Sequence, residues 1–220
     1  TTKYITGNGT SIGGVIIDAG NFDWSNGLFH EFTEPSAGYH GLVYHEALGP
    51  AAFIAKVRIE GLRDLGSAPS PFNCFQTIQG LETLSIRIKK HSENALKVAE
   101  WLENQDKVEW VNYPGLKSSK YYDLSKKYLK NGQSGIVTFG LKGGFDSAKK
   151  LTDNTKIFSL LANFGDSKSL IIHPSSTTHQ QLNEEQQKST GVTSDLVRLS
   201  IGLEDPVDLI NDLKDALNSI

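Results

Sequence analysis

The first residues of the chain that could carry out chemistry are a lysine beside a hydroxyl side chain, followed closely by glycines. Thr2 precedes Lys3, and Gly7 and Gly9 come shortly after. A lysine amine forms an imine with an aldehyde, and it becomes a usable base when its pKa is lowered. Glycines let the backbone pass close to a bound group. Alone this motif is weak, because a lysine near a chain terminus is usually solvated.

A second candidate is a serine nucleophile. Residues 9–13 fit the G-x-S-x-G pattern around Ser11, and Asp166 and His173 follow in the order of the hydrolase triad. That pattern requires a strand, a sharp turn and then a helix, so that the serine is thrust outward. Here the apolar, β-branched run 15–17 follows the serine and predicts a buried strand instead. The order of elements therefore argues against a serine hydrolase.

Two further motifs are also disfavoured. The early glycines do not form a dinucleotide fingerprint, because Ile12 stands where the third glycine is needed. His40 and His45 are five residues apart with Glu46 adjacent, whereas ligands on one helix face need a spacing of three or four. A structural histidine pair is favoured over a metal site, and no metal is predicted.

Composition narrows the class of protein. The 220 residues carry a net charge of -3 and are 38% hydrophobic, so a sizeable core can form and no basic patch indicates nucleic-acid binding. A single cysteine excludes an internal disulfide framework and fits a reducing compartment. No apolar run predicts a membrane span or a signal peptide. We expect a soluble, cytoplasmic protein. Because the chain has no methionine and opens abruptly, we also expect a fragment of something longer.

The hydrophobic pattern predicts an α/β fold. In the first half we expect a long ordered loop over residues 19–40, helix over 42–65 broken at Gly49-Pro50, and a long helix from Pro71, kinked at Gly80. The inward stripe of that long helix is predicted from apolar spacing, and its members are Leu81, Leu84, Ile88, Ala95, Ala99 and Leu102. Because such a helix can bridge two domains, we place a domain boundary near residue 88.

The second half alternates between the two kinds of element. Strands are predicted at 108–111, 136–141, 157–163, 170–173 and 196–201, and helices at 118–130, 145–153 and 183–189. The closing helix is the clearest, because Asp205 caps it and Pro206 occupies its first turn. Its predicted inward residues are Leu209, Ile210, Leu213 and Leu217. The alternation predicts a sheet covered by helices.

Motifs along the whole chain resemble one family, the pyridoxal-phosphate (PLP) enzymes of cysteine and methionine metabolism. The lysine motif at residues 2–9 resembles the stretch that carries the Schiff-base lysine in that family, with Asn8 where His or Gln is usual. Six further segments resemble it in the expected order: Gly38–Gly41, Gly61–Asp64, Ser70–Asn73, Gln79–Leu84, His173–His179 and Val197–Asp205. The Gly-Tyr-His-Gly segment and the loop before it are most similar to the O-acetylhomoserine sulfhydrylase (homocysteine synthase) branch.

The resemblance implies a fold, a cofactor and a site. The fold is type I PLP-dependent transferase (aminotransferase-like), with residues 1–88 ending the large cofactor domain and 89–220 forming the C-terminal α/β domain. Lys3 would hold the pyridoxal 5'-phosphate and Thr2 would donate to its phosphate. Arg198 would bind the substrate carboxylate, and Asn163 would be a second polar contact near it. A guanidinium suits this task because its paired donors match a carboxylate.

The same resemblance implies an activity and an assembly. The expected reaction is γ-replacement, in which O-acetyl-L-homoserine and sulfide yield L-homocysteine and acetate in methionine biosynthesis, by a homotetramer. The family's phosphate-binding serine, pyridine-nitrogen aspartate and two active-site tyrosines would come from upstream residues. A sibling activity remains open, namely cystathionine γ-synthase or methionine or cystathionine γ-lyase. So do, more remotely, a non-catalytic fragment and a serine hydrolase.

Overall fold

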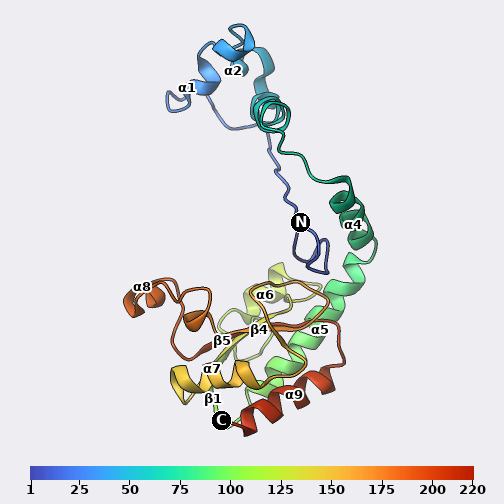
Figure 1. The fold of residues 1–220 in the computed structure, drawn as a ribbon, viewed down its shortest axis with the longest axis vertical. Coiled ribbons are helices and arrows are strands. Elements are labelled where there is room, and N and C mark those ends of the chain that lie inside the picture. Colours follow the sequence, from blue (N-terminus) through green and yellow to red (C-terminus); the bar gives the residue numbers. More distant parts are fainter. The chain divides into compact units, whose positions relative to one another are not determined.

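The computed structural model describes all residues from Thr1 to Ile220. It divides into two compact units, one made of Thr1–Ile12 with Phe75–Ile220 and the other of Gly13–Cys74. Figure 1 shows the chain coloured along its sequence. Because this division describes compactness only, the predicted domain boundary near residue 88 stays a prediction.

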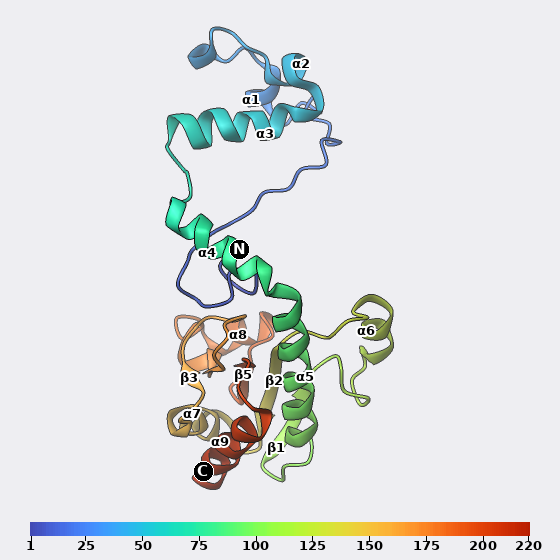
Figure 2. The same ribbon diagram turned by 90° about the vertical axis from the view of Figure 1, so that its right-hand side faces the viewer.

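The larger unit is built on a five-stranded mixed sheet in the order β1-β2-β5-β4-β3, whose arrows are visible in Figure 2. The strands are β1 Val108–Asn112, β2 Ile136–Leu141, β3 Ser159–Leu160, β4 Leu170–Ile172 and β5 Leu196–Ser200. Neighbouring strands pair antiparallel except β3 and β4, which are parallel. The strands predicted in the second half of the chain are therefore confirmed, although the one expected over 157–163 is reduced to two residues.

Helices cover this sheet and complete its core. α5 (Leu84–Leu102) contacts β1 and β2, α7 (Gly144–Asn154) contacts β2 and β5, and α9 (Pro206–Asn218) packs against both helices. The buried core includes Leu102, Phe139 and Leu213. Two shorter helices, α6 (Tyr122–Tyr128) and α8 (Glu184–Ser189), and the 3-10 turn η4 (Pro174–Ser176) lie in the connections. The predicted helices over 118–130, 145–153 and 183–189 are confirmed, the first of them shorter than expected.

The closing helix α9 begins as its sequence predicts. The side chain of Asp205 accepts a hydrogen bond from the amide of Val207, and Pro206 occupies the first turn. Leu209, Leu213 and Leu217 are buried, while Ile210 is only partly buried. The cap satisfies one of the amide donors that every helix start leaves unpaired.

The long helix expected from Pro71 is present as two helices. α4 spans Pro71–Glu82, Thr83 interrupts it, and α5 follows directly. The inward stripe of α5 is confirmed at Ala95, Ala99 and Leu102, which are fully buried. The prediction that Leu81 faces the core is wrong, because half of its surface is exposed. Leu84 and Ile88, near the start of α5, are only partly buried. The apolar period therefore holds over the second half of α5 and does not extend back into α4.

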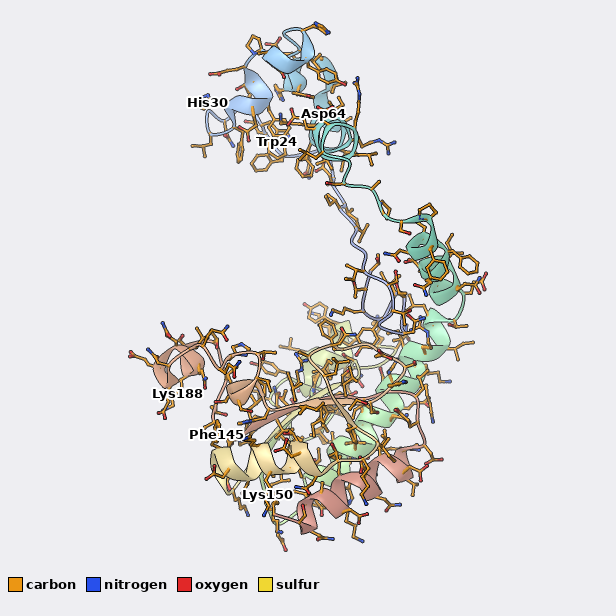
Figure 3. The ribbon with its side chains drawn as sticks, in the orientation of Figure 1. Trp24, His30, Asp64, Phe145, Lys150 and Lys188 are labelled. Atoms are coloured by element: carbon orange, nitrogen blue, oxygen red, sulfur yellow. The ribbon has the colours of Figure 1, made fainter.

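The smaller unit is helical. It contains α1 (His30–Thr33), η1 (Ala37–Tyr39), α2 (Tyr44–Leu48), η2 (Gly49–Ala51), α3 (Ala52–Lys56) and a π-helix, η3 (Val57–Asp64). The helix expected over 42–65 is thus confirmed, with its break at Gly49-Pro50. The stretch 19–40, expected to be a long ordered loop, includes the short helices α1 and η1. Aromatic side chains within it pack against one another. Trp24, labelled in Figure 3, stacks on Phe32 and Phe53 at centroid distances of 4.2 and 5.4 Å.

The buried strand predicted at residues 15–17 is wrong. These residues have no regular secondary structure, and Val15, Ile16 and Ile17 are 65%, 59% and 88% exposed. A strand needs a neighbour to pair its backbone groups. In the unit Gly13–Cys74 the only ladder contact is an isolated bridge between Ser36 and Leu42. An apolar, β-branched run is therefore not sufficient for a strand here.

None of the helices combines the length and the apolar character that a membrane-spanning helix requires.

Candidate active site

The predicted lysine lies on a compact turn at the start of the chain. The amide of Thr6 donates to the carbonyl of Thr1 at 3.1 Å, and the amide of Gly7 donates to the carbonyl of Lys3 at 2.8 Å. Gly7 has φ +83°, which side chains rarely adopt, and a Cβ there would lie 2.2 Å from Nη1 of Arg87. The glycine after the lysine is thus required by both backbone shape and close approach. Thr2 is a partly buried member of the same turn.

The side chain of Lys3 points to a residue far along the chain. Its Nζ lies 2.5 Å from Oδ1 of Asn163 and 4.9 Å from the centre of the Phe164 ring. Lys3 takes part in none of the ion pairs of the chain. The contacts of the amine are therefore a neutral acceptor and an aromatic face.

Arg198 lies in the middle of β5, opposite Thr138 of β2 and Ile172 of β4. Its Nη2 donates to the backbone carbonyl of Asn163 at 3.1 Å, while its buried Nε has no hydrogen-bond partner. Burial lowers the pKa of this guanidinium from its usual value, because desolvation disfavours the charged form. A partly buried cation with an unpaired donor fits an anionic ligand such as a carboxylate.

Asn163 joins the two groups. Its side chain accepts from Lys3 and its main-chain carbonyl accepts from Arg198. The turn that follows is fastened on both sides: the amide of Gly165 donates to Oγ of Ser200 at the end of β5, and the amide of Ser167 donates to the carbonyl of Gly7. The structure therefore brings Lys3 and Arg198 to a common neighbour, Asn163, from positions up to 195 residues apart.

A further arginine, which sequence reasoning missed, holds the turn from the other side. Arg87 of α5 is only 9% exposed and donates to the carbonyls of Tyr4, Ile5 and Gly80 at 2.8, 3.2 and 2.7 Å. Burial lowers its pKa. A signal was present, because steps of four and three back from the buried Leu102 lead to His91 and Arg87. The buried face was missed at these two positions because arginine and histidine do not match an apolar stripe.

The other candidate motifs do not assemble into a site. His173 uses Nδ1 for Oγ of Ser176 and Nε2 for the carbonyl of Ser194, both at 2.8 Å, so its ring nitrogens are engaged away from Asp166. Asp166 accepts instead from the amide of Lys168. The chain contains no group of three or more His, Cys, Asp or Glu residues that could hold a metal ion.

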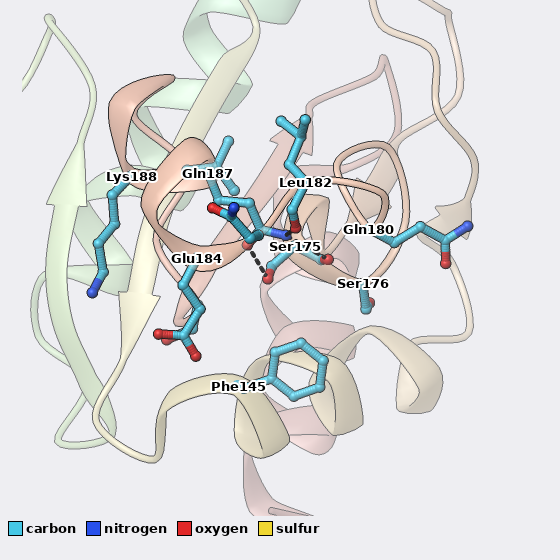
Figure 4. A pocket seen from close by; sticks show the side chains of 11 residues that line it. Phe145, Ser175, Ser176, Gln180, Leu182, Glu184, Gln187 and Lys188 are labelled. Atoms are coloured by element: carbon cyan, nitrogen blue, oxygen red, sulfur yellow. Dashed lines mark hydrogen bonds between the residues drawn. The ribbon is translucent and has the colours of Figure 1, made fainter.

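A separate hollow of about 770 Å³ lies beside α8 (Figure 4). Phe145 contributes an aromatic wall, and Oγ of Ser175 donates to the side-chain carbonyl of Gln187 at 2.7 Å on another side. None of the predicted site residues lines it. This hollow is therefore distinct from the lysine site.

Comparison with known proteins places the whole chain in one family. The family described as Cys/Met metabolism PLP-dependent enzyme matches residues 1–218. The chain is 55% identical to O-acetyl-L-homoserine sulfhydrylase of Leptospira meyeri and 49% identical to O-acetyl-L-homoserine sulfhydrylase 1 of Thermus thermophilus. These alignments cover 100% and 98% of the chain, and 52% and 51% of the two relatives. The chain therefore spans about half the length of the curated relatives it matches.

A solved structure confirms the fold class. A Campylobacter jejuni O-acetylhomoserine (thiol)-lyase, which carries N'-pyridoxyl-lysine-5'-monophosphate, superposes with a TM-score of 0.89 at 46% identity. The match covers 99% of this chain and 52% of the other. The predicted α/β fold of the type I PLP-dependent transferases is thus confirmed. With a family match from the first residue to the last helix, this chain belongs to the PLP-dependent enzymes of Cys/Met metabolism.

Proposed function

We propose that the protein containing this chain converts O-acetyl-L-homoserine and sulfide into L-homocysteine and acetate, with pyridoxal 5'-phosphate bound at Lys3. The observation that carries this proposal is the junction at Asn163, where an amine and a guanidinium meet on one residue. Relatives at 55% and 49% identity bear the name O-acetyl-L-homoserine sulfhydrylase. Their names support this reaction over the sibling synthase and lyase activities.

The residues present fit the cofactor and the substrate. Lys3 supplies the amine that an imine with the cofactor aldehyde requires, and its contacts are an amide oxygen and an aromatic ring. Thr2 adjoins it as the candidate donor to the cofactor phosphate. The unpaired Nε of Arg198 supplies a buried donor beside Nη2. A planar fork with a free donor matches the α-carboxylate of an amino acid.

In this mechanism each residue has one task. Pyridoxal phosphate, when bound, supplies the electron sink. With the cofactor bound, the amine of Lys3 would accept a proton from the substrate carbon next to the carboxylate and would deliver protons later in the reaction. Oδ1 of Asn163 accepts from that amine and orients it, and Arg198 holds the carboxylate. Overall a carbon–oxygen bond to acetate breaks, and a carbon–sulfur bond to hydrosulfide forms.

The assembly and the division of the chain belong to this proposal. We propose a cytoplasmic homotetramer, in which residues 1–88 complete the cofactor domain and 89–220 form the substrate-side domain. The support is the motif resemblance along the chain and, for the compartment, the presence of a single cysteine. Chromatography with light scattering on the holoenzyme measures the assembly, and a monomer would contradict it.

The direct test is to trap the lysine. Borohydride reduction of the full-length holoenzyme, followed by peptide mass spectrometry, should find the pyridoxyl group on Lys3. The variant Lys3→Ala should lose it and lower kcat by about 10²–10⁴-fold, the range for loss of a positioned acid–base group. Lys168→Ala, at an exposed lysine of the same unit, is the matched control and should keep both.

Product analysis tests the reaction itself. O-acetylhomoserine should give homocysteine with sulfide as acceptor. A product that forms equally well with cysteine as acceptor would indicate cystathionine synthesis, and rapid turnover with no acceptor would indicate a lyase. Either result would overturn the sulfhydrylase proposal while leaving the role of Lys3 intact.

A further inference from the structure

Helix α5 carries a stripe of buried polar side chains near its start. Arg87, His91 and Asn94 are 9%, 0% and 0% exposed. Spacings of four and three residues place all three on one face of the helix. Buried polar groups of this kind are costly unless each is hydrogen-bonded. Each of these side chains bonds to main-chain carbonyls outside its own helix.

Arg87 binds the turn that carries Lys3. Its guanidinium spans the carbonyls of Tyr4 and Ile5, and Gly80 of α4 supplies a third acceptor. Its Nε donates to Oγ1 of Thr83 at 3.2 Å, which fixes the plane of the group. Arg87 takes part in none of the ion pairs of the chain. A buried cation that bonds only to neutral acceptors contributes little to stability, because no opposite charge offsets its desolvation. It does fix the positions of its acceptors, because the planar guanidinium fork accommodates only one arrangement of them.

The other two members bind the segment that leaves β5. Nδ1 of His91 donates to the carbonyl of Ile201 at 2.6 Å. Nδ2 of Asn94 donates to the carbonyls of Gly202 and Glu204 at 3.1 and 2.8 Å. That segment directly follows the strand that carries Arg198. One helix face therefore contacts both the lysine turn and the end of the arginine strand.

Two close contacts leave little freedom in this arrangement. The ring of Tyr4 packs edge-on against His91, with centroids 5.3 Å apart. A Cβ added at Gly80 would lie 2.4 Å from the carbonyl oxygen of Ile5. The turn thus packs against the junction of α4 and α5, with the fork of Arg87 inserted among its carbonyls.

We infer that Arg87 is a positioning residue that holds the Lys3 turn in register with β5, so that the amine meets Asn163 and Arg198. The inference rests on the proposed role of Lys3 and extends it to a residue that does not touch the reacting atoms. Through its polar face, α5 contacts both the turn that carries Lys3 and the segment that follows the strand of Arg198, although these two segments are distant in sequence.

The test uses the full-length holoenzyme with Arg87→Met and Arg87→Lys. Hydrogen exchange of the peptide covering residues 1–12 reports the turn directly, through the amides of Thr6 and Gly7. We expect Arg87→Met to speed their exchange and to lower kcat, each by about tenfold or more, as the loss of charge-assisted hydrogen bonds implies. KM for O-acetylhomoserine should change less than kcat, because Arg198 is untouched. Arg87→Lys keeps the charge without the fork, and it should restore only part of both losses.

A matched control separates positioning from plain destabilisation. Asp212 is also buried and charged, and its carboxylate accepts from the amides of Lys156, Ile157 and Phe158. Asp212→Asn should lower Tm, as Arg87→Met does, and should leave exchange at residues 1–12 and the kinetic constants at their wild-type values.

Several results decide against the inference. If Arg87→Met lowers Tm but leaves exchange at residues 1–12 and kcat unchanged, the inference is overturned. If that variant does not fold, Thr83→Val replaces it, because it removes only the acceptor of Arg87 Nε; an exchange rate equal to wild type would again overturn it. If wild-type Lys3 carries no pyridoxyl group, the proposed function fails, and the exchange measurement still decides whether Arg87 holds the turn.

Discussion

Lys3 and Arg198 share one neighbour: the side chain of Asn163 accepts from the lysine, and its backbone carbonyl accepts from the arginine. A single residue thereby sets the distance between an amine and a guanidinium. Because one contact uses the side chain and the other the main chain, substitution can separate them. This division makes the two roles independently testable.

Asn163→Ala should impair the lysine and spare the arginine. The substitution removes Oδ1 and keeps the carbonyl that binds Arg198. We expect kcat to fall by about 2–13-fold, as for a lost hydrogen bond of about 0.5–1.5 kcal/mol, with KM for O-acetylhomoserine changing less. Steady-state kinetics of the holoenzyme measures both. A larger change in KM than in kcat would contradict the assignment.

Arg198→Lys should have the opposite signature. Lysine keeps the charge but loses the planar fork, so a bidentate grip on a carboxylate is lost. We expect KM to rise, and kcat/KM to fall by about 10–150-fold, as expected for about 1.5–3 kcal/mol of a charged hydrogen bond. Borohydride labelling of Lys3 should be unchanged in this variant. Kinetic constants equal to those of wild type would exclude Arg198 as the carboxylate ligand.

Gly80→Ala should displace the lysine turn. An added Cβ would lie 2.4 Å from the carbonyl oxygen of Ile5 and 2.5 Å from that of Thr6. Both oxygens belong to the backbone of the turn, so they cannot move away without shifting it. We therefore expect a loss of about 1–3 kcal/mol in the free energy of unfolding and weaker binding of pyridoxal phosphate. Gly61→Ala is the matched control, because a Cβ there meets only Cγ1 of Val57, at 4.0 Å. Similar results for the two variants would refute the packing argument.

The stability of the protein should decrease as the pH falls below about 6.5, in part through His91. Burial, aided by the cation of Arg87, lowers the pKa of this histidine below its ordinary value of 6.5. The unfolded chain then binds the proton that the folded chain does not, so the stabilisation is complete above pH 6.5 and is lost below it. One group contributes a slope of at most about 1.4 kcal/mol per pH unit.

Urea unfolding of the wild type and of His91→Asn between pH 7.5 and 5.5 measures this slope. The variant should show a shallower dependence, although His173, whose pKa burial also lowers, keeps part of it. Parallel curves for wild type and His91→Asn would disprove the contribution of His91.

The cap of the last helix offers a test of stability alone. Asp205→Ala removes the acceptor for the amide of Val207, and such losses cost about 0.5–2 kcal/mol. Asp215→Ala, an exposed carboxylate within α9, is the control and should change stability by less than about 0.5 kcal/mol. Thermal unfolding should separate the two variants, and equal Tm values would show that the cap does not contribute.

The sequence by itself determined what depends on neighbouring residues. The period of Ala95, Ala99 and Leu102 predicted the buried face of α5, and Asp205 with Pro206 predicted the start of α9. The lysine motif and Arg198 were identified from side-chain chemistry and family resemblance. In each case the deciding interactions lie within a few residues of one another, or in the chemistry of one side chain.

Only the tertiary structure decided which distant groups meet. The contact between Lys3 and Asn163 spans 160 positions, and the grip of Arg87 on Tyr4 spans 83. The local sequence predicts that an arginine in an amphipathic helix is exposed to solvent. The carbonyl groups that Arg87 binds lie on another segment, so the local sequence does not indicate its burial. The strand predicted at residues 15–17 is wrong for a similar reason, because its formation depends on another segment of the chain. Backbone pairing depends on a neighbour that local sequence does not specify.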